Sequence, residues 1–212
     1  MADLSVHGPL REDMVFGGLS ISFDQRILRP RPWTLMQSRW AAELLPDLPD
    51  GRVLELCCGA GHIGLAAVWA TSRPLLCVDR DPVAASYAVA NAERAGMADR
   101  VEVRAAALDL ALDDAERFAL VVADPPWVRT DQTGRWPEDP LGAIDGGPGG
   151  LDVARLCLEV SARHLLEGAV VLVQLGSVAQ AEDLRVPAAA HGLTLGEVRV
   201  GDGGVVARWE TR

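Results

Sequence analysis

The sequence predicts an α/β fold, a doubly wound and mostly parallel sheet of seven strands with an antiparallel hairpin at its C-terminal end. Short apolar runs alternate with longer amphipathic stretches, and many of these runs are apolar along their whole length. The last apolar stretch is divided by a glycine-rich turn. Strands that alternate with helices form parallel sheets covered on both faces, and their two buried faces make such strands apolar throughout.

The elements follow in order from these patterns. A helix is expected to start near Thr34, behind the Arg- and Pro-rich residues 29–33. Asp81 is expected to cap the helix at 82–95, because Pro82 suits a first helical position and Gly96 suits the residue after a helix. The predicted strands are 52–57, 75–78, 101–104, 118–123 and 169–174, and the other predicted helices are 63–70, 151–166 and 179–190.

The C-terminal part is predicted to contain two strands within residues 193–209, joined by the turn at 201–204. Residues 129–150 are rich in Gly, Pro and Asp, and a loop of this length in a compact domain is usually functional or disordered. Sheets of this kind bind ligands beyond the carboxyl ends of their strands.

The composition limits the classes of partner. The chain has 212 residues, with 20 basic and 30 acidic residues and a net charge of −10, which suits one acidic domain. This charge makes nucleic acid an unfavourable partner without excluding it, and it argues against an anionic membrane surface. No apolar run is long enough for a bilayer, the N-terminus lacks the pattern of a signal peptide, and the four cysteines form no C-x-x-C motif. These observations predict a cytoplasmic protein with reduced thiols.

The first candidate site is the glycine-rich turn after the strand at 52–57. Its spacing, Gly59-x-Gly61-x-x-Gly64, also fits a dinucleotide fingerprint, so a nicotinamide-dependent oxidoreductase is one alternative. Glu55 argues against that alternative, because a carboxylate there would repel a pyrophosphate and attract the ammonium group of an amino-acid cofactor.

Asp79 is the second candidate, at the end of the next strand. A carboxylate at this point can accept hydrogen bonds from both ribose hydroxyls of an adenosine ligand. Its neighbour Arg80 is included in the predicted cofactor site.

The third candidate is Asp124-Pro125-Pro126-Trp127, directly after the strand at 118–123. The prolines stiffen the loop and leave its carbonyls free to accept hydrogen bonds. An ionised Asp124 also accepts, so the loop suits a ligand –NH₂ that donates two hydrogen bonds, and Trp127 offers a flat face to a planar amide or base. Such contacts would direct the nitrogen lone pair towards an electrophile.

These three sites, in this order on these strands, resemble the class I S-adenosylmethionine-dependent methyltransferases, which have a Rossmann-like sheet. The tetrapeptide at 124–127 is similar to that of the amino-methyltransferases, and the closer likeness is to the HemK-type protein glutamine methyltransferases. Residues 16–34 and 143–152 carry that likeness as well, and it covers roughly residues 15–175.

The resemblance implies a site and a division of the chain. Residues 1–34 would be a segment covering the cofactor cleft, and residues 35–212 the methyltransferase domain. The adenine would lie near Ala107 and Leu108, where family members often have an acid and an aromatic, and Asp109 could substitute. The methionine part of S-adenosylmethionine would be lined by Cys57, Cys58, Gly59, Ala60 and Gly61, beside Glu55, Asp79 and Asp124.

The chain departs from the family pattern at three motif positions. Trp33 stands where the family has an acidic residue, Asp124 where it has Asn, and Trp127 where it has Tyr. No counterpart of the family's N-terminal helical domain, which docks release factors, is expected. The predicted function is therefore methyl transfer to a planar –NH₂ of a protein, a base or a small molecule, and a non-catalytic binding module with the same fold is a further alternative.

Three arginines and a Cys–His pair are weaker candidates. Arg26, Arg29 and Arg31 would either grip an acidic substrate or be solvated. Cys58 and His62 could share a metal, but no second ligand pair has suitable spacing, so no metal is predicted.

Overall fold

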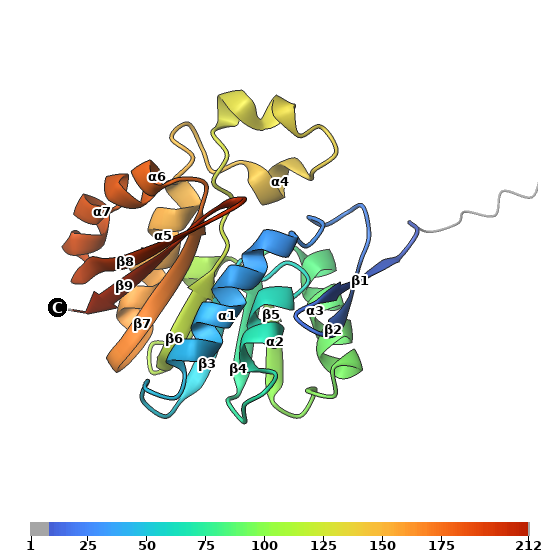
Figure 1. Cartoon of the computed structure of the whole chain (residues 1–212), viewed down its shortest axis with the longest axis horizontal. Helices are drawn as coiled ribbons and strands as arrows, with labels where there is room; N and C mark the ends of the chain where they lie inside the picture. The colour runs from blue at the N-terminus through green and yellow to red at the C-terminus, as the bar shows by residue number, and fades with distance from the viewer. Residues whose placement is uncertain (1–8, 212) are drawn as a thin grey trace, which may run out of the picture.

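The computed structural model describes residues 9–211 and confirms the predicted fold class. A seven-stranded sheet has the order β5-β4-β3-β6-β7-β9-β8, in which the first five strands are parallel and the last two antiparallel (Figure 1). Its strands are β3 (Arg52–Leu56), β4 (Leu75–Asp79), β5 (Val101–Ala105), β6 (Phe118–Ala123), β7 (Leu165–Leu175), β8 (Leu193–Gly201) and β9 (Gly204–Thr211).

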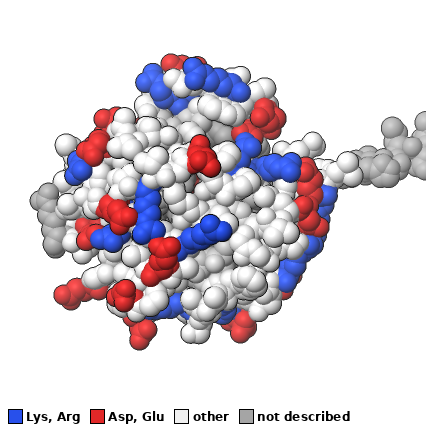
Figure 2. Space-filling model, in the orientation of Figure 1, with Lys and Arg blue, Asp and Glu red and all other residues white. Residues whose placement is uncertain are grey.

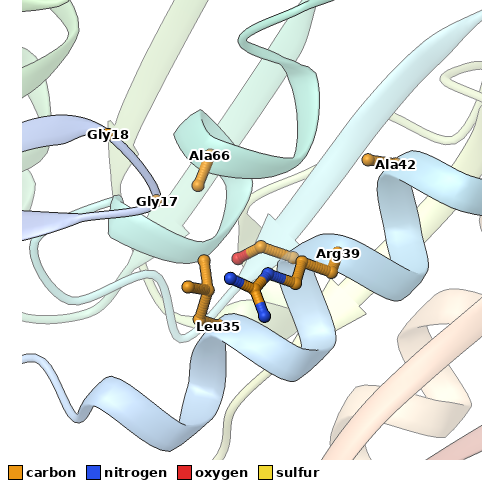
Figure 3. Close-up of a pocket in the computed structure, with 7 residues that line it drawn as sticks. Gly17, Gly18, Leu35, Arg39, Ala42 and Ala66 are labelled. Carbon is orange, nitrogen blue, oxygen red and sulfur yellow. The ribbon is translucent and has the colours of Figure 1, made fainter.

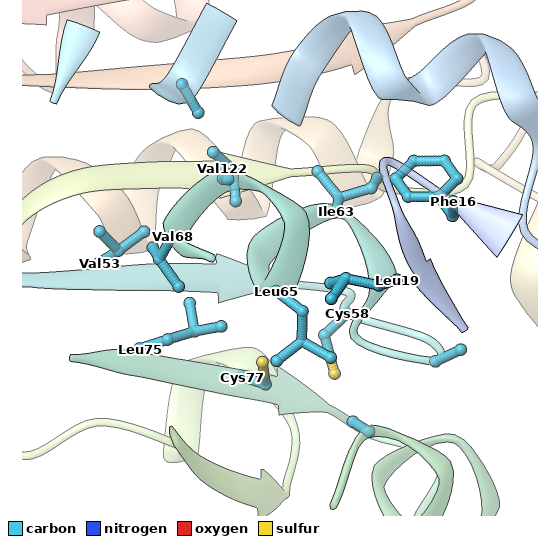
Figure 4. Packing of buried hydrophobic residues seen from close by; sticks show 14 of the residues in the cluster. Phe16, Leu19, Val53, Cys58, Ile63, Leu65, Val68, Leu75, Cys77 and Val122 are labelled. Carbon is cyan, nitrogen blue, oxygen red and sulfur yellow. The ribbon is translucent and has the colours of Figure 1, made fainter. Parts of the chain in front are cut away.

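Helices cover both faces of the sheet. One face packs against α1 (Leu35–Leu44), α2 (His62–Val68) and α3 (Pro82–Arg94). The other packs against α5 (Asp152–His164), α6 (Val178–Asp183) and α7 (Arg185–Ala190). Along β3, Val53 belongs to the first core and Leu54 to the second, as the alternation of side chains in a strand requires. Figure 4 shows the first core, where Ile63, Leu65 and Val68 of α2 meet the sheet.

Several boundaries differ from the sequence prediction for identifiable reasons. β3 ends at Leu56 because Cys57 has a left-handed backbone, with φ of +57°, that a strand cannot continue. The predicted helix at 151–166 was too long, since β7 begins at Leu165. The predicted helix at 179–190 is two short helices, because Pro187 has no N–H to bond back to Asp183. The Asp81 cap was correct, since its side chain accepts from the Val83 N–H at 2.8 Å.

An N-terminal hairpin was not predicted from the sequence. Strands β1 (Glu12–Phe16) and β2 (Leu19–Phe23) form a separate two-stranded sheet beside α3 (Figure 1). Phe16 and Ile21 are nevertheless buried in the same core as α2 and α3. The prediction that residues 1–34 cover a cofactor cleft falls partly on residues 1–8, which lie outside the described residues.

Asn91 of α3 connects this hairpin to the glycine-rich turn. Its side-chain oxygen accepts from the Ser22 N–H at 2.8 Å, and its amide nitrogen donates to the carbonyls of Ser22 at 3.0 Å and Ala60 at 2.9 Å. Asn91 is completely buried. Its side chain therefore supplies the hydrogen-bond partners of three backbone groups in the protein interior.

No described helix is long and apolar enough to cross a membrane. Acidic and basic side chains are interspersed over the face in Figure 2, without a continuous basic area.

We expect Asn91→Leu to lower the free energy of unfolding by about 3 kcal/mol or more, because it leaves several buried backbone groups unpaired at about 1–3 kcal/mol each. Urea unfolding followed by circular dichroism measures the change. Ser86→Ala, an exposed change on the same helix, is the control and should stay within about 0.5 kcal/mol of the parent. Equal stability of the two variants would contradict the role given to Asn91.

Candidate active site

Three carboxyl groups that are distant in sequence meet at the carboxyl edge of neighbouring strands. Asp79 ends β4, Glu55 is the second-last residue of β3, and Asp124 directly follows β6. The strand order β4-β3-β6 places them side by side, with Glu55 in register with Cys77 and with Val122. The three candidate motifs of the sequence therefore share one edge of the sheet.

The turn between β3 and α2 is built for close approach to a ligand. Cys57 and Gly59 both have left-handed φ angles, and a Cβ atom added to Gly59 would find nothing within 4 Å. The Cys58 N–H donates to the Val78 carbonyl at 3.0 Å, and the Gly59 N–H donates to Asp79 at 2.8 Å, so the turn is fixed against β4. The backbone beside Gly59 is thus rigid and open on one side.

Glu55 is the most deeply placed of the three acids, with 2% of its surface exposed. The Cys77 thiol donates to it at 3.3 Å, and the Gly64 N–H donates from α2. Burial raises the pKa of Glu55 to about 8, although these two donors act in the opposite direction. The negative charges of Asp124 and Asp79 raise it further.

Asp79 is held by two backbone donors. Its Oδ2 accepts from the Gly59 N–H and its Oδ1 from the Asp81 N–H, at 2.8 and 2.9 Å. Burial raises the pKa of Asp79, and these two hydrogen bonds partly oppose that shift. Each carboxylate oxygen has a second lone pair, so both can still accept a hydrogen bond from a ligand.

Asp124 lies in a different environment. Within the described part of the chain its carboxyl group has no hydrogen-bond or ion-pair partner, and burial raises its pKa to about 7. It is therefore an acceptor group whose hydrogen-bonding capacity the protein itself does not use.

The position of Trp127 is fixed by Gly176 and Gln180, which follow β7. The backbone of Gly176 approaches so closely that a Cβ there would lie 2.6 Å from the indole Cε3. Gln180 bridges the two, because its amide nitrogen donates to the Trp127 carbonyl at 2.9 Å and its amide oxygen accepts from the Gly176 N–H at 2.8 Å. The six-membered ring of the indole thus packs on the loop after β7.

The long segment 129–150 is hydrogen-bonded to the loop that follows β6. It contains the turn η3 (Thr130–Arg135) and the short helix α4 (Leu141–Ile144), above the sheet in Figure 1. The Val128 N–H donates to the Ile144 carbonyl at 3.0 Å, and the Gly146 N–H donates to the Val128 carbonyl at 2.8 Å. Arg80 donates to the Gly142 carbonyl at 2.9 Å. The segment thereby joins the end of β4 to the loop after β6.

A cavity of about 460 Å³ opens beside this loop. Its walls come from four separate parts of the chain. Trp136 and Glu138 belong to the long segment 129–150 and Asp202 to the turn at 201–204, but no sequence pattern predicts that these three residues line one cavity. The lining residues are Leu28, Arg31, Trp33, Thr34, Asp124, Pro125, Pro126, Trp127, Val128, Trp136, Glu138, Asp139, Ala143, Ile144, Asp202 and Gly203.

Other predicted residues lie less directly at the site. Ala107 is exposed at the start of η2 (Leu108–Leu110), and Leu108 is 8% exposed in the second core. The three arginines proposed as a cluster, at positions 26, 29 and 31, do not form a free basic patch. Arg26 pairs with Asp24, Arg29 with Glu12 and Arg31 with Asp139.

His62 is buried between the glycine-rich turn and the N-terminal segment. Its Nε2 lies 3.4 Å from the Thr34 hydroxyl, the Phe16 ring meets it edge-on at 4.8 Å between centroids, and burial lowers its pKa to about 3. Among residues 9–211, no group of three or more His, Cys, Asp or Glu side chains could hold a metal ion. All four cysteines are free.

A second cavity of about 350 Å³ lies between the β1–β2 turn, α1 and α2. Figure 3 shows Arg39 and Leu35 of α1 on one side of it and Gly17 and Gly18 of the turn on the other. It takes no residue from the carboxyl edge of the sheet, so it is separate from the candidate site.

Comparisons with known proteins agree with a methyltransferase fold. Residues 37–135 match the family model "Methyltransferase small domain". The ribosomal protein L11 methylase of Lactobacillus delbrueckii subsp. bulgaricus superimposes with a TM-score of 0.66 at 14% identity, covering 89% of this chain and 83% of that one. The fold is that of the Rossmann-like methyltransferases.

The curated proteins with similar sequences include several glutamine methyltransferases. The chain is 29% identical over 175 residues to the release factor glutamine methyltransferase of Clostridium acetobutylicum (79% of this chain, 61% of the relative) and 35% identical over 170 residues to that of Mycolicibacterium smegmatis (75% and 57%). It is 30% identical to the ribosomal protein uL3 glutamine methyltransferase of Bradyrhizobium diazoefficiens (75% and 54%). The predicted resemblance to HemK-type methyltransferases is confirmed, and the chain spans less than two thirds of these relatives.

We expect Glu55→Gln to flatten the pH dependence of stability. The folded-state pKa of Glu55 lies near 8, above its ordinary value of 4.5, so its contribution is fully present below about pH 4.5 and is lost as the pH rises through 8. Removing this ionisation should reduce the slope between pH 6 and 8 by up to about 1.4 kcal/mol per pH unit. Urea unfolding at several pH values tests this, with exposed Asp99→Asn as control. Parallel curves for parent and E55Q would contradict the assignment.

We also expect Gly176→Ala to displace the Trp127 indole. Overpacking of this kind costs about 1–3 kcal/mol, and the near-ultraviolet circular dichroism of the tryptophans should change. Gly149→Ala is the matched control, because a Cβ at Gly149 meets nothing within 4 Å. An unchanged spectrum for G176A would show that the indole does not rest on Gly176.

Proposed function

We propose that this chain is an N-methyltransferase that moves a methyl group from S-adenosylmethionine to a planar –NH₂, with a protein glutamine amide as the acceptor. The observation that carries the proposal is the position of Asp124. Its carboxyl group, without a partner among residues 9–211, directly follows β6 beside β3 and its glycine-rich turn, and it lines a cavity that contains three tryptophans.

The residues present fit S-adenosylmethionine. The open side of Gly59 leaves room for close contact with a ligand, and Asp79 keeps free lone pairs for ribose hydroxyls. Glu55 would complement the ammonium group of the methionine part, and residues 57–61 with Arg80 would complete the site. Ala107 and Leu108 stay predicted adenine contacts. When bound, this cofactor supplies a methyl group on a positively charged sulfur.

Residues 124–127 would contribute to catalysis mainly by aligning the acceptor nitrogen. An amide –NH₂ must donate two hydrogen bonds, and the Asp124 carboxylate and Pro125 carbonyl are the two acceptors proposed for it. Holding both hydrogens fixes the direction of the nitrogen lone pair and stabilises positive charge that develops on nitrogen. Pro126 keeps the loop stiff, and the free face of Trp127 would stack on the planar amide.

The choice of a protein acceptor follows the relatives. Those named here are glutamine methyltransferases of release factors or of ribosomal protein uL3. Because the chain spans 54–61% of those proteins' lengths, the acceptor protein itself belongs to the proposal. A nicotinamide-dependent oxidoreductase and a non-catalytic binding module are the two competing functions.

Two measurements separate these functions. S-adenosylhomocysteine should raise the melting temperature in a concentration-dependent manner while NAD does not, since only a ligand that binds the folded state stabilises it. Isotopically labelled methyl donor should then label a protein in a cell extract, identified by mass spectrometry. Stabilisation by NAD would favour the oxidoreductase, and cofactor binding without any methyl transfer would favour the binding module.

We expect Asp124→Ala and Asp79→Ala to affect different steps. Loss of the Asp124 acceptor should lower kcat by about 100-fold or more and leave the Kd for S-adenosylhomocysteine nearly unchanged. Loss of Asp79 should weaken that Kd by about 10- to 100-fold, because it removes charge-assisted hydrogen bonds of about 1.5–3 kcal/mol. Calorimetry and single-turnover assays provide the two values. Identical effects of both variants would refute the division of roles.

The pH profile offers an independent test of Asp124. Only the carboxylate offers all its oxygens as acceptors, so kcat/KM should fall about tenfold per unit below a pKa near 7 and level off above it. Asp124→Asn, which keeps an acceptor oxygen and cannot ionise in this range, should have a flatter profile through pH 7. An unaltered profile in D124N would assign the titration to another group.

A further inference from the structure

The cavity beside Asp124 offers more than an amide requires. Its volume of about 460 Å³ lies in the range of sites that hold whole small ligands, about 300–1,000 Å³. Three of the six tryptophans of the chain line it, namely Trp33, Trp127 and Trp136. Substrate atoms beyond the acceptor –NH₂ can therefore occupy the same space.

One part of this cavity already contains a cation between an indole and a carboxylate. The Arg31 guanidinium lies 5.7 Å from the centre of the Trp33 ring and forms an ion pair with Asp139. The protein's own arginine thus satisfies both Trp33 and Asp139. The backbone of Gly203, in the β8–β9 turn, packs closely on the same indole.

The lining contains further indoles and carboxylates that are not paired with an arginine among the described contacts. Trp127 and Trp136 have no arginine over their rings among the described contacts, whereas Trp33 and Trp40 each have one. Glu138 and Asp202 are exposed at the cavity and, within residues 9–211, form neither an ion pair nor a side-chain hydrogen bond. Arg31 is the only basic residue in the lining, and Asp139 neutralises it.

We propose that these lining groups form a subsite for a positively charged side chain of the substrate, so that the methylated glutamine lies in a peptide segment with an arginine or lysine nearby. The groups are Trp127, Trp136, Glu138 and Asp202. Carboxylates and indole faces both attract guanidinium and ammonium groups, and the attraction grows as water is excluded. This inference rests on the proposed function and specifies the chemistry of its acceptor.

The same charges disfavour other occupants. A phosphate-bearing substrate would meet Glu138, Asp202 and Asp124 with no free arginine in the lining to offset them. Glu138 and Asp202 line the cavity and are exposed, which suits a peptide segment that continues from the glutamine towards solvent. We therefore commit to a basic peptide and treat a nucleobase as an outcome of the test.

The test uses four synthetic peptides that differ only in one residue beside a central glutamine, which is Arg, Lys, Ala or Glu. Methyl transfer from labelled donor gives kcat/KM for each, and anisotropy of fluorescent peptides with S-adenosylhomocysteine present gives Kd independently of turnover. Relative to the Ala peptide, the Arg and Lys peptides should have a kcat/KM about tenfold higher and a Kd about tenfold lower, as expected for a cation–π contact with an ion pair. The Glu peptide should be the poorest.

The variant E138Q/D202N should bring the ratio between the Arg and Ala peptides close to one. Asp99→Asn removes an acidic charge just before β5, at the amino ends of the strands, and should preserve that ratio. Retention of the ratio in the double variant would overturn the subsite.

Each negative result of these experiments overturns a different part of the proposal. Equal kcat/KM for the Arg and Ala peptides would overturn the subsite and leave the proposed function intact. Methylation of a free nucleobase and of no peptide would overturn the commitment to a peptide. Absence of methyl transfer together with absence of stabilisation by S-adenosylhomocysteine would overturn the proposed function itself.

Discussion

Desolvation of carboxyl groups at one edge of the sheet is the constraint on which the rest of the site depends. Glu55, Asp79 and Asp124 lie at the C-terminal ends of three adjacent strands, and burial raises the pKa of each. The protein satisfies the first two with backbone N–H groups and a thiol, which fixes the glycine-rich turn and α2 in position. Asp124 has no partner within the part of the chain that the structure describes, and such a desolvated group is costly unless a ligand uses it.

The remainder of the chain shapes the space around that carboxyl group. Gly176 and Gln180 set the position of the Trp127 indole, and the segment 129–150 is bonded to Val128. Residues from the N-terminal segment and from the β8–β9 turn then complete the cavity wall. Because the cavity is assembled from four distant segments, substitutions in the lining loops can change which acceptor binds while the carboxyl groups at the edge of the sheet stay the same. One fold can support many substrates in this way.

Much of the fold was predictable because its signals are local. Apolar runs, the Asp81–Pro82 helix start and the glycine-rich turn identified the alternation of strands and helices. The errors have local causes too: Pro187 divides a predicted helix, and β7 starts before Gly168 instead of after it. The β1–β2 hairpin was not predicted because β1 is mostly exposed and the hairpin is held by contacts with distant Asn91 and with the core of α2 and α3.

The sequence by itself determined the fold class and the motifs at 55–61, 79 and 124–127, because each depends on residues close together in the chain. Only the tertiary structure decided that Arg31 is paired with Asp139, that Gly176 supports Trp127, and that Glu138 and Asp202 border the same cavity as Asp124. These relations join residues that lie tens to more than a hundred positions apart. They arise from strand order and loop packing, which no local pattern of residues encodes.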